Sequence, residues 1–245
     1  MIQIKITDKD YNEENLFYVQ SSLSEFLPVA GCSIYTQKEN GRCSLLINCS
    51  ECYADIVKTE VADKVSEVIT IKYKYEFLKK NLKVGGLSEM EKEILMTSLI
   101  AADLEDDKRY AFDRIKIFKD ITVDGIYNFR LKPLVKKWQD VASYIPTCFL
   151  TTQLKEFILY LLENKKRRVY VDGGRVYDSH YRRLKRSSLL GGEDIKIVKE
   201  VLLSNCGEVE LNGEIPKDDE YYLKEYYCDK LHFSKSSNTM DKYLN

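Results

Sequence analysis

Histidine is scarce in this sequence, and so are the motifs of common enzyme classes. Only His180 and His232 are present, and neither stands in a recognisable pattern with a nucleophile, so acid–base catalysis by histidine is poorly supported. The glycine pairs at 85–86 and 191–192 lack the Lys and the Ser or Thr of a phosphate-binding loop, and we interpret them as helix punctuation. The acidic run at 105–107 is typical of a solvated helix face rather than of a catalytic pair. We therefore expect no catalytic residue and no cofactor.

Long apolar runs are also absent. No stretch approaches the roughly 18 apolar residues that a membrane span needs. The N-terminus has no basic region followed by an apolar run, which is what a secretory signal would show. We therefore expect a cytoplasmic protein without a membrane span.

An excess of charge of one sign is missing as well. The 245 residues include 38 Lys and Arg against 39 Asp and Glu, which gives a formal net charge of −1. This balance excludes a histone-like polyelectrolyte, so any attraction to nucleic acid must be local. The hydrophobic content of 44% is sufficient for a core, and the length allows one or two domains.

The seven cysteines form no clear metal site. An odd number favours reduced thiols over a disulfide framework. Cys49 and Cys52 have the spacing of a zinc knuckle or a redox pair, and Cys32 and Cys43 lie on neighbouring predicted strands. A structural zinc needs four ligands, and Cys43 and Cys49 alternate with apolar residues as core residues do. We therefore expect buried or incidental thiols and no metal.

What the sequence does contain is a set of strand and helix patterns that predicts an α+β fold. The first six residues alternate as a strand, residues 11–27 have helical spacing, and residues 32–49 predict a hairpin with Asn40-Gly41 as its turn. Together they predict a β-α-β-β unit. We expect residues 54–77 to be helical, although residues 69–77 alternate like a strand.

The middle of the chain predicts further helices. Ser88 and Glu91 form a capping box, in which each side chain satisfies the backbone N–H of the other residue. Residues 130–145 repeat apolar side chains at intervals of three and four. Residues 151–164 predict another helix, with one of its two leading threonines as the cap.

Residues 165–186 are the least ordinary stretch of the chain. They hold nine basic residues against two acidic ones, a net charge of +7. With Gly173-Gly174 as a two-residue loop, this stretch predicts a β-hairpin with one apolar face and one face of Arg and Tyr side chains. The candidate residues for binding a nucleic acid or a partner are Lys165, Lys166, Arg167, Arg168, Tyr170, Arg175, Tyr177, Arg182, Arg183, Lys185 and Arg186.

These patterns divide the chain into four expected parts. They are an N-terminal α+β unit at 1–84, a helical core at 85–164, a C-terminal unit of hairpin and helices at 165–233, and a polar tail at 234–245. We expect the C-terminal unit to pack with the helical core.

The helical middle also resembles a known family. Residues 85–163, and above all the segment DGIYNFRL from Asp124 to Leu131, resemble the YtxC-like family of sporulation proteins from endospore-forming bacteria. The resemblance covers about a third of the chain. It implies a cytoplasmic protein associated with sporulation, and no catalytic residue is carried over from it.

Two interpretations of the basic hairpin remain open. Two helices followed by a basic hairpin are the order of a winged-helix DNA binder, which would place Lys and Arg on phosphates and use Tyr170 or Tyr177 for stacking. Alternatively, the hairpin pairs with residues 193–229, whose net charge is −7. If the segment EVEL joined the hairpin as a third strand, its two glutamates would lie on the face of Arg168 and Arg175. We favour this internal pairing.

We therefore expect a non-enzymatic protein that binds another macromolecule, with an unknown protein partner in sporulation. Nucleic-acid binding through residues 165–186 is the alternative.

Overall fold

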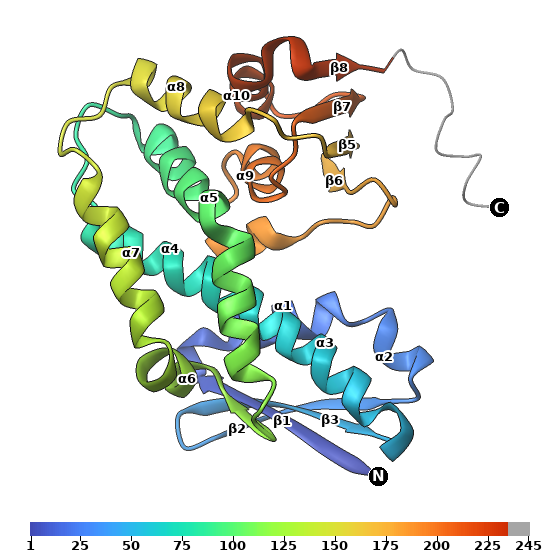
Figure 1. The fold of residues 1–245 in the computed structure, drawn as a ribbon. Coiled ribbons are helices and arrows are strands. Elements are labelled where there is room, and N and C mark those ends of the chain that lie inside the picture. Colours follow the sequence, from blue (N-terminus) through green and yellow to red (C-terminus); the bar gives the residue numbers. More distant parts are fainter. Residues whose placement is uncertain (235–245) are drawn as a thin grey trace. The chain divides into compact units, whose positions relative to one another are not determined.

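The computed structural model describes residues 1–234, which form an α+β fold, as predicted. The chain divides into two compact units. One unit comprises Met1–Leu82 and Asp103–Ile145, and the other comprises Lys83–Ala102 and the chain from Pro146 onward. Helix α5 (Glu89–Ile115) therefore belongs to both (Figure 1). The helical core expected at 85–164 is thus divided between the two units. Residues 235–245, nearly all of the predicted polar tail, lie outside the described residues.

The first unit is built on a four-stranded sheet of order β2-β3-β1-β4. Its strands are β1 (Ile2–Lys9), β2 (Ser33–Glu39), β3 (Arg42–Cys49) and β4 (Asp120–Thr122). Strand β1 runs antiparallel to β3 and parallel to β4. The β2–β3 turn is Asn40-Gly41, with φ of 51° and 71°, so the predicted hairpin is confirmed.

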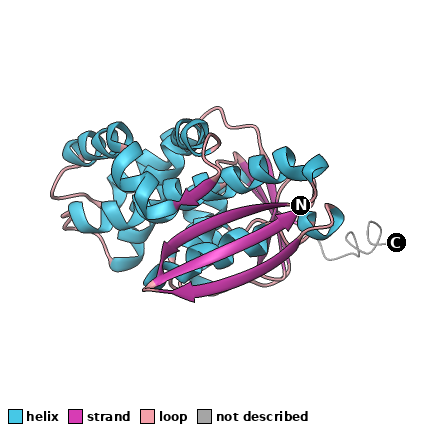
Figure 2. Cartoon of the chain, turned by 90° about the horizontal axis from the view of Figure 1, so that it is seen from below, coloured by secondary structure: helices cyan, strands magenta, loops and turns pink. Residues whose placement is uncertain are grey.

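Helices cover one face of this sheet. They include α1 (Glu13–Ser22), between β1 and β2, and α3 (Ala54–Glu67), which packs on α1. The buried side chains Ile4 and Ile6 of β1 alternate with polar ones, as a sheet with one covered face requires. In Figure 2, which views this sheet from below, the strands lie in front of the helices. The predicted β-α-β-β order is therefore confirmed.

Residues 69–77 are helical, as we expected. A π-helical turn, η3 (Val68–Tyr73), joins α3 to α4 (Lys74–Asn81). All side chains of η3 except Lys72 are buried, so this part of the helix has no exposed polar face to give it an amphipathic period. This explains why its sequence resembles a strand.

The first unit contains five further helices, three of them short. They are η1 (Asp10–Asn12), α2 (Phe26–Val29), η2 (Glu51–Tyr53), α6 (Val123–Arg130) and α7 (Lys132–Tyr144).

The second unit has a sheet of order β6-β5-β7-β8. Its elements are α8 (Thr151–Leu162), β5 (Arg168–Asp172), β6 (Arg175–Tyr177), η4 (Arg186–Leu190), α9 (Lys196–Leu203), β7 (Glu208–Asn212), α10 (Lys217–Tyr227), η5 (Cys228–Lys230) and β8 (Leu231–Phe233). Strands β5 and β6 form the predicted hairpin, and β7 pairs parallel to β5 as the third strand. Strand β8 adds parallel to β7 at the other edge of the sheet.

The predicted cap of α8 was wrong. Neither leading threonine has a cap hydrogen bond, and the N-cap residue is Leu150. The N–H of Leu150 donates to Oε1 of Gln153 at 2.9 Å. A glutamine side chain from the first turn therefore satisfies the backbone N–H at the start of the helix.

The capping box of α5 is confirmed. The Ser88 N–H donates to Oε2 of Glu91 at 2.8 Å, and the Glu91 N–H donates to Oγ of Ser88 at 3.2 Å. Replacing Ser88 by Ala should lower the free energy of unfolding by about 0.5–2 kcal/mol, because an N–H at the helix start loses its acceptor. Urea unfolding of the variant measures this loss, and an unchanged midpoint would contradict it.

The expectation of a uniformly solvated acidic run at 105–107 was wrong for Asp107. Its side chain is 1% exposed, and its carboxylate accepts hydrogen bonds from Lys74 Nζ, Lys137 Nζ and Trp138 Nε1, each at 2.8 Å. Lys74 is itself 1% exposed. A buried ionic cluster therefore ties α4, α5 and α7 together in the first unit.

Candidate functional site

The basic hairpin is part of a larger sheet whose outer face is not basic. Strand β7 places Glu208 beside Arg168, and Arg168 donates through Nε to Oε2 of Glu208 at 2.9 Å. A second carboxylate, that of Glu210, lies 3.6 Å from Arg168. The hydrogen bond and the positive charge of Arg168 lower the pKa of Glu208. The internal pairing predicted for Arg168 is present.

The charges on this outer face add up to a slight negative excess. Since the valines of β5 and β6 are buried, the alternate residues face outward. The charged ones on β5, β6 and β7 are Arg168, Arg175, Asp172, Glu208 and Glu210, two basic and three acidic residues. A phosphate backbone would therefore meet no net positive charge on these strands.

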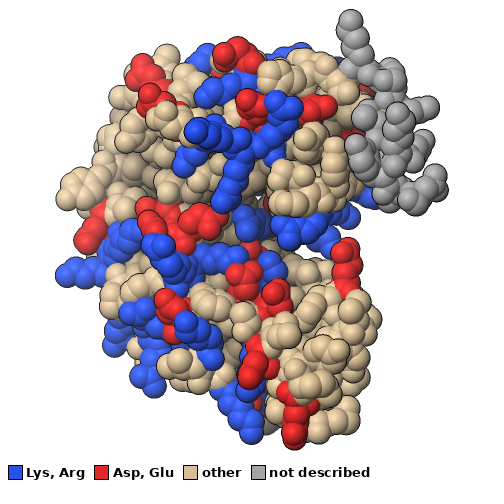
Figure 3. Space-filling model, turned by 45° about the vertical axis from the view of Figure 1, so that its right-hand side comes forward, with Lys and Arg blue, Asp and Glu red and all other residues tan. Residues whose placement is uncertain are grey.

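Other candidate residues of this stretch have structural contacts. Tyr170 stacks on Tyr181 with ring centroids 4.9 Å apart, which covers one face of the Tyr170 ring. Arg182 lies 2.8 Å from Asp178. Figure 3 shows blue and red side chains interleaved on the face that it views, rather than one blue patch.

The rest of the basic candidates are spread over several local structures. Lys165, Lys166 and Arg167 precede β5, while Tyr177 lies on β6 and bridges to Arg183. Lys185 precedes η4, and Arg186 is the first residue of η4, where its N–H donates to Oε1 of Glu200 at 3.0 Å.

The features that a winged helix needs are distributed over the two units. Helix α7 belongs to the first unit, and α8 belongs to the second. Strand β5 has β6 on one side and β7 on the other, so the hairpin is not a free wing.

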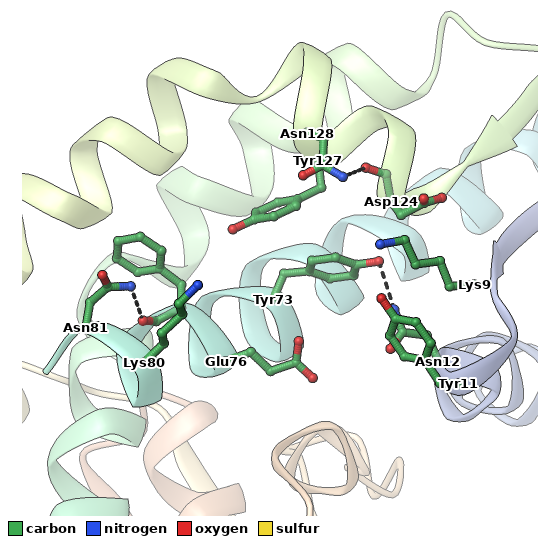
Figure 4. Close-up of a pocket in the computed structure, with 11 residues that line it drawn as sticks. Lys9, Tyr11, Asn12, Tyr73, Glu76, Lys80, Asn81, Asp124, Tyr127 and Asn128 are labelled. Atoms are coloured by element: carbon green, nitrogen blue, oxygen red, sulfur yellow. Dashed lines mark hydrogen bonds between the residues drawn. The ribbon is translucent and has the colours of Figure 1, made fainter.

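A cleft in the first unit gathers side chains that the sequence analysis did not select. Its volume is about 420 Å³. The start of the chain, the η3–α4 segment and α6 contribute its walls (Figure 4). The lining residues are Lys9, Tyr11, Asn12, Tyr73, Glu76, Phe77, Lys80, Asn81, Asp124, Tyr127 and Asn128.

A buried hydrogen-bond network anchors one side of the cleft. Asp8 is fully buried, and it accepts hydrogen bonds from Asn15 at 2.8 Å, from the Lys9 N–H at 2.8 Å and from the Tyr73 hydroxyl at 3.0 Å. Burial raises the pKa of the Asp8 carboxyl above its usual range, although these hydrogen bonds act to lower it. Asn12 also donates to the Tyr73 hydroxyl at 3.3 Å, so the network fixes both lining side chains.

Aromatic rings form the central walls of the cleft. The rings of Tyr73 and Tyr127 lie 4.6 Å apart between centroids, and Tyr127 also stacks near Trp138 at 6.2 Å. Burial and the nearby Asp8 raise the pKa of Tyr73, so its phenol is neutral at physiological pH. This aromatic part of the cleft wall is therefore uncharged.

The acidic residues of the cleft have ion-pair partners, whereas its two lysines do not have one among the described residues. Asp124 accepts hydrogen bonds from both terminal nitrogens of Arg42, and Glu76 lies 3.4 Å from Lys72. By contrast, neither Lys9 nor Lys80 forms an ion pair with any described residue. Figure 4 shows these two lysines toward opposite ends of the view.

None of the binding residues predicted in the stretch 165–186 lines this cleft. One signal was available, because Asp124, Tyr127 and Asn128 come from the DGIYNFRL segment that carries the family resemblance. The remaining lining residues come from two separate parts of the chain, residues 9–12 and 73–81, and no sequence period connects them.

Neither a metal site nor a similarity to known proteins assigns a function to this cleft. Within residues 1–234, no three or more His, Cys, Asp or Glu side chains are arranged to hold a metal ion. None of the helices in that range has the length and apolar character that crossing a membrane requires. Comparison of the chain with family models, with curated proteins and with solved structures finds no match.

Proposed function

We propose that this is a binding protein of the cytoplasm whose cleft captures an acidic segment of a partner protein. On the resemblance of residues 85–163 to the YtxC-like family, the proposal also assigns that partner to sporulation. The protein would act by holding its partner, and no bond would be made or broken in the cleft.

The unequal pairing of charges carries the proposal. Both carboxylates that line the cleft have a cation within 4 Å, whereas no carboxylate of the described residues lies within that distance of the ammonium groups of Lys9 and Lys80. Lys9 contacts Tyr11, whose hydrogen bond and charge raise the pKa of the lysine, and the more distant carboxylates of Asp124 and Asp8 raise it further. The cleft therefore offers two positive charges to a ligand, and carboxylates complement them.

Three asparagines favour a peptide as the ligand. The Nδ2 atoms of Asn81 and Asn128 donate to the carbonyl oxygens of Phe77 and Asp124, both at 2.7 Å, and Nδ2 of Asn12 donates to Tyr73. These bonds orient the amides, whose Oδ1 atoms accept no hydrogen bond from any described residue. Such oxygens suit the N–H groups of an extended peptide, and the tyrosine walls suit its apolar side chains.

Nucleic-acid binding by residues 165–186 has less support. The outer face of β5, β6 and β7 carries one more acidic than basic residue, as described above. A duplex-binding surface would need an excess of lysine and arginine there.

The proposal predicts charge-dependent peptide binding. The probe is a fluorescent, capped heptapeptide of alternating Glu and Tyr, compared with its Gln–Tyr counterpart by anisotropy at two salt concentrations. We expect the Glu peptide alone to bind, with an affinity that falls as salt rises. Lys9→Ala and Lys80→Ala should each weaken binding about two- to fivefold, the effect of one exposed ion pair.

Lys136→Ala is the matched control, since this exposed lysine of α7 does not line the cleft. Equal binding of both peptides, or an equal loss in Lys136→Ala, would refute the proposal. Salt-sensitive binding of ATP with no peptide binding would instead assign the cleft to a nucleotide.

A further inference from the structure

We propose that Cys32 and Cys49 are a modification site, at which a low-molecular-weight disulfide such as glutathione disulfide oxidises them to a cross-strand disulfide. Both thiols are free in the structure. This site is separate from the cleft, and the inference does not depend on the proposed function.

The register of the β2–β3 hairpin places the two cysteines opposite each other. Ser33 pairs with Asn48, so the next position outward pairs Cys32 with Cys49. The hairpin closes at Glu39 and Arg42 around a two-residue turn, where the closing pair is hydrogen-bonded in both directions.

Hydrogen-bonded and non-hydrogen-bonded pairs alternate along an antiparallel ladder. Counting from the closing pair, Cys32 and Cys49 fall at a non-hydrogen-bonded position. In agreement, the Cys32 N–H donates elsewhere, to the Leu27 carbonyl at 2.9 Å. Opposed Cα atoms at such positions are about 4.5 Å apart, within the range of about 4.4–6.8 Å that disulfides span.

The two thiols differ in access. Cys49 is buried beside β1, where it pairs with Ile2, whereas Cys32 is partly exposed at the mouth of the hairpin. Burial raises the pKa of the Cys32 thiol, and the neighbouring Cys49 raises it further. The Cys32 thiol is therefore slow to react at neutral pH, and its reaction accelerates as the pH rises.

The chemistry balances with one oxidant molecule. The Cys32 thiolate attacks one sulfur of glutathione disulfide, forming a mixed disulfide and releasing one glutathione thiolate. The Cys49 thiolate then attacks the Cys32 sulfur and expels the second glutathione. The two cysteines lose two protons and two electrons, and the oxidant becomes two thiols.

The nearby Cys52 provides the competing outcome. It is exposed, its Sγ lies 2.9 Å from Oγ of Ser50, and it completes the CSEC spacing with Cys49. A bond between Cys49 and Cys52 would have to join a buried strand residue to the short helix η2. The hairpin pair needs no such rearrangement, because its strands are already in register.

Peptide mapping of the full chain tests the proposal. The protein is incubated with glutathione disulfide at pH 8, alkylated, digested without reduction and analysed by mass spectrometry. We expect a linked peptide pair that contains Cys32 and Cys49, has lost two hydrogens and disappears after dithiothreitol. Its yield should be unchanged in Cys52→Ser, while Cys49→Ser should leave glutathione attached at Cys32.

Two outcomes would overturn the inference. One is a linkage between Cys49 and Cys52 in place of the hairpin pair. The other is glutathione attached only at the exposed thiols of Cys52, Cys148 and Cys228, with Cys32 and Cys49 still reduced. Both outcomes are read from the wild-type chain, so neither depends on whether a variant folds.

Discussion

Replacing Asp107 by Asn should lower the free energy of unfolding by about 3–5 kcal/mol. The change keeps the size of the side chain and removes its charge, so the buried ammonium of Lys74 loses the carboxylate that lies 2.8 Å away. The nearest remaining carboxylate, that of Asp103, is 3.6 Å from Lys74. The buried charge of Lys74 would then have only this longer ion pair, which is costly because burial removes its hydration.

The matched control is Asp106→Asn, in the neighbouring position of α5. The side chain of Asp106 is 70% exposed and pairs only with Arg109, which is 76% exposed, so its loss should change stability by less than about 0.5 kcal/mol. Urea unfolding followed by fluorescence of Trp138, the single tryptophan, measures both variants. Equal midpoints for the two variants would show that the cluster around Asp107 contributes no stability.

The burial of Asp107 could have been predicted from the helical spacing of its neighbours, although it lies within a run of three acidic residues. Asp107 continues the spacing of Ile100, Leu104 and Ala111, which are buried at intervals of three and four along α5. An acidic residue on an apolar stripe indicates a buried partner. Successive residues of a helix point in different directions, so three adjacent acidic residues do not share one environment.

Local chemistry explains the predictions that were confirmed. The Asn40-Gly41 turn and the Gly173-Gly174 loop each fix a hairpin register within a few residues, and the capping box fixes the start of α5. Each of these signals lies inside a short segment, so one sequence is sufficient to detect it.

Long-range pairing explains what could not be predicted. Strand β4 joins β1 across more than a hundred residues, and no local pattern announces this contact. The same holds for the cleft, whose lining residues come from the beginning of the chain, from α4 and from α6. Helix α5 is one continuous helical pattern, and no break in that pattern indicates that the helix belongs to both units.

The backbone of Gly207 lies directly against another stretch of backbone, at residues 165–167. It precedes β7, and its N–H donates to the Arg167 carbonyl at 2.8 Å. A Cβ at this position would lie 2.0 Å from the carbonyl oxygen of Lys165 and 2.6 Å from its carbonyl carbon. Both neighbouring groups are main chain beside β5, so relief requires the β5–β7 pairing to shift.

Replacing Gly207 by Ala should therefore lower the free energy of unfolding by about 3 kcal/mol, at the upper end of overpacking effects. The control is Gly85→Ala in the same unit, where the added Cβ would lie 3.6 Å from the Thr147 carbonyl oxygen, an ordinary contact. We expect Gly85→Ala to change stability by less than about 0.5 kcal/mol. Urea unfolding followed by circular dichroism compares the two, with amide hydrogen exchange in β5 and β7 to locate the change. A Gly207→Ala variant as stable as Gly85→Ala, with β5 and β7 equally protected, would mean that the backbone of Lys165 does not pack against Gly207 in solution.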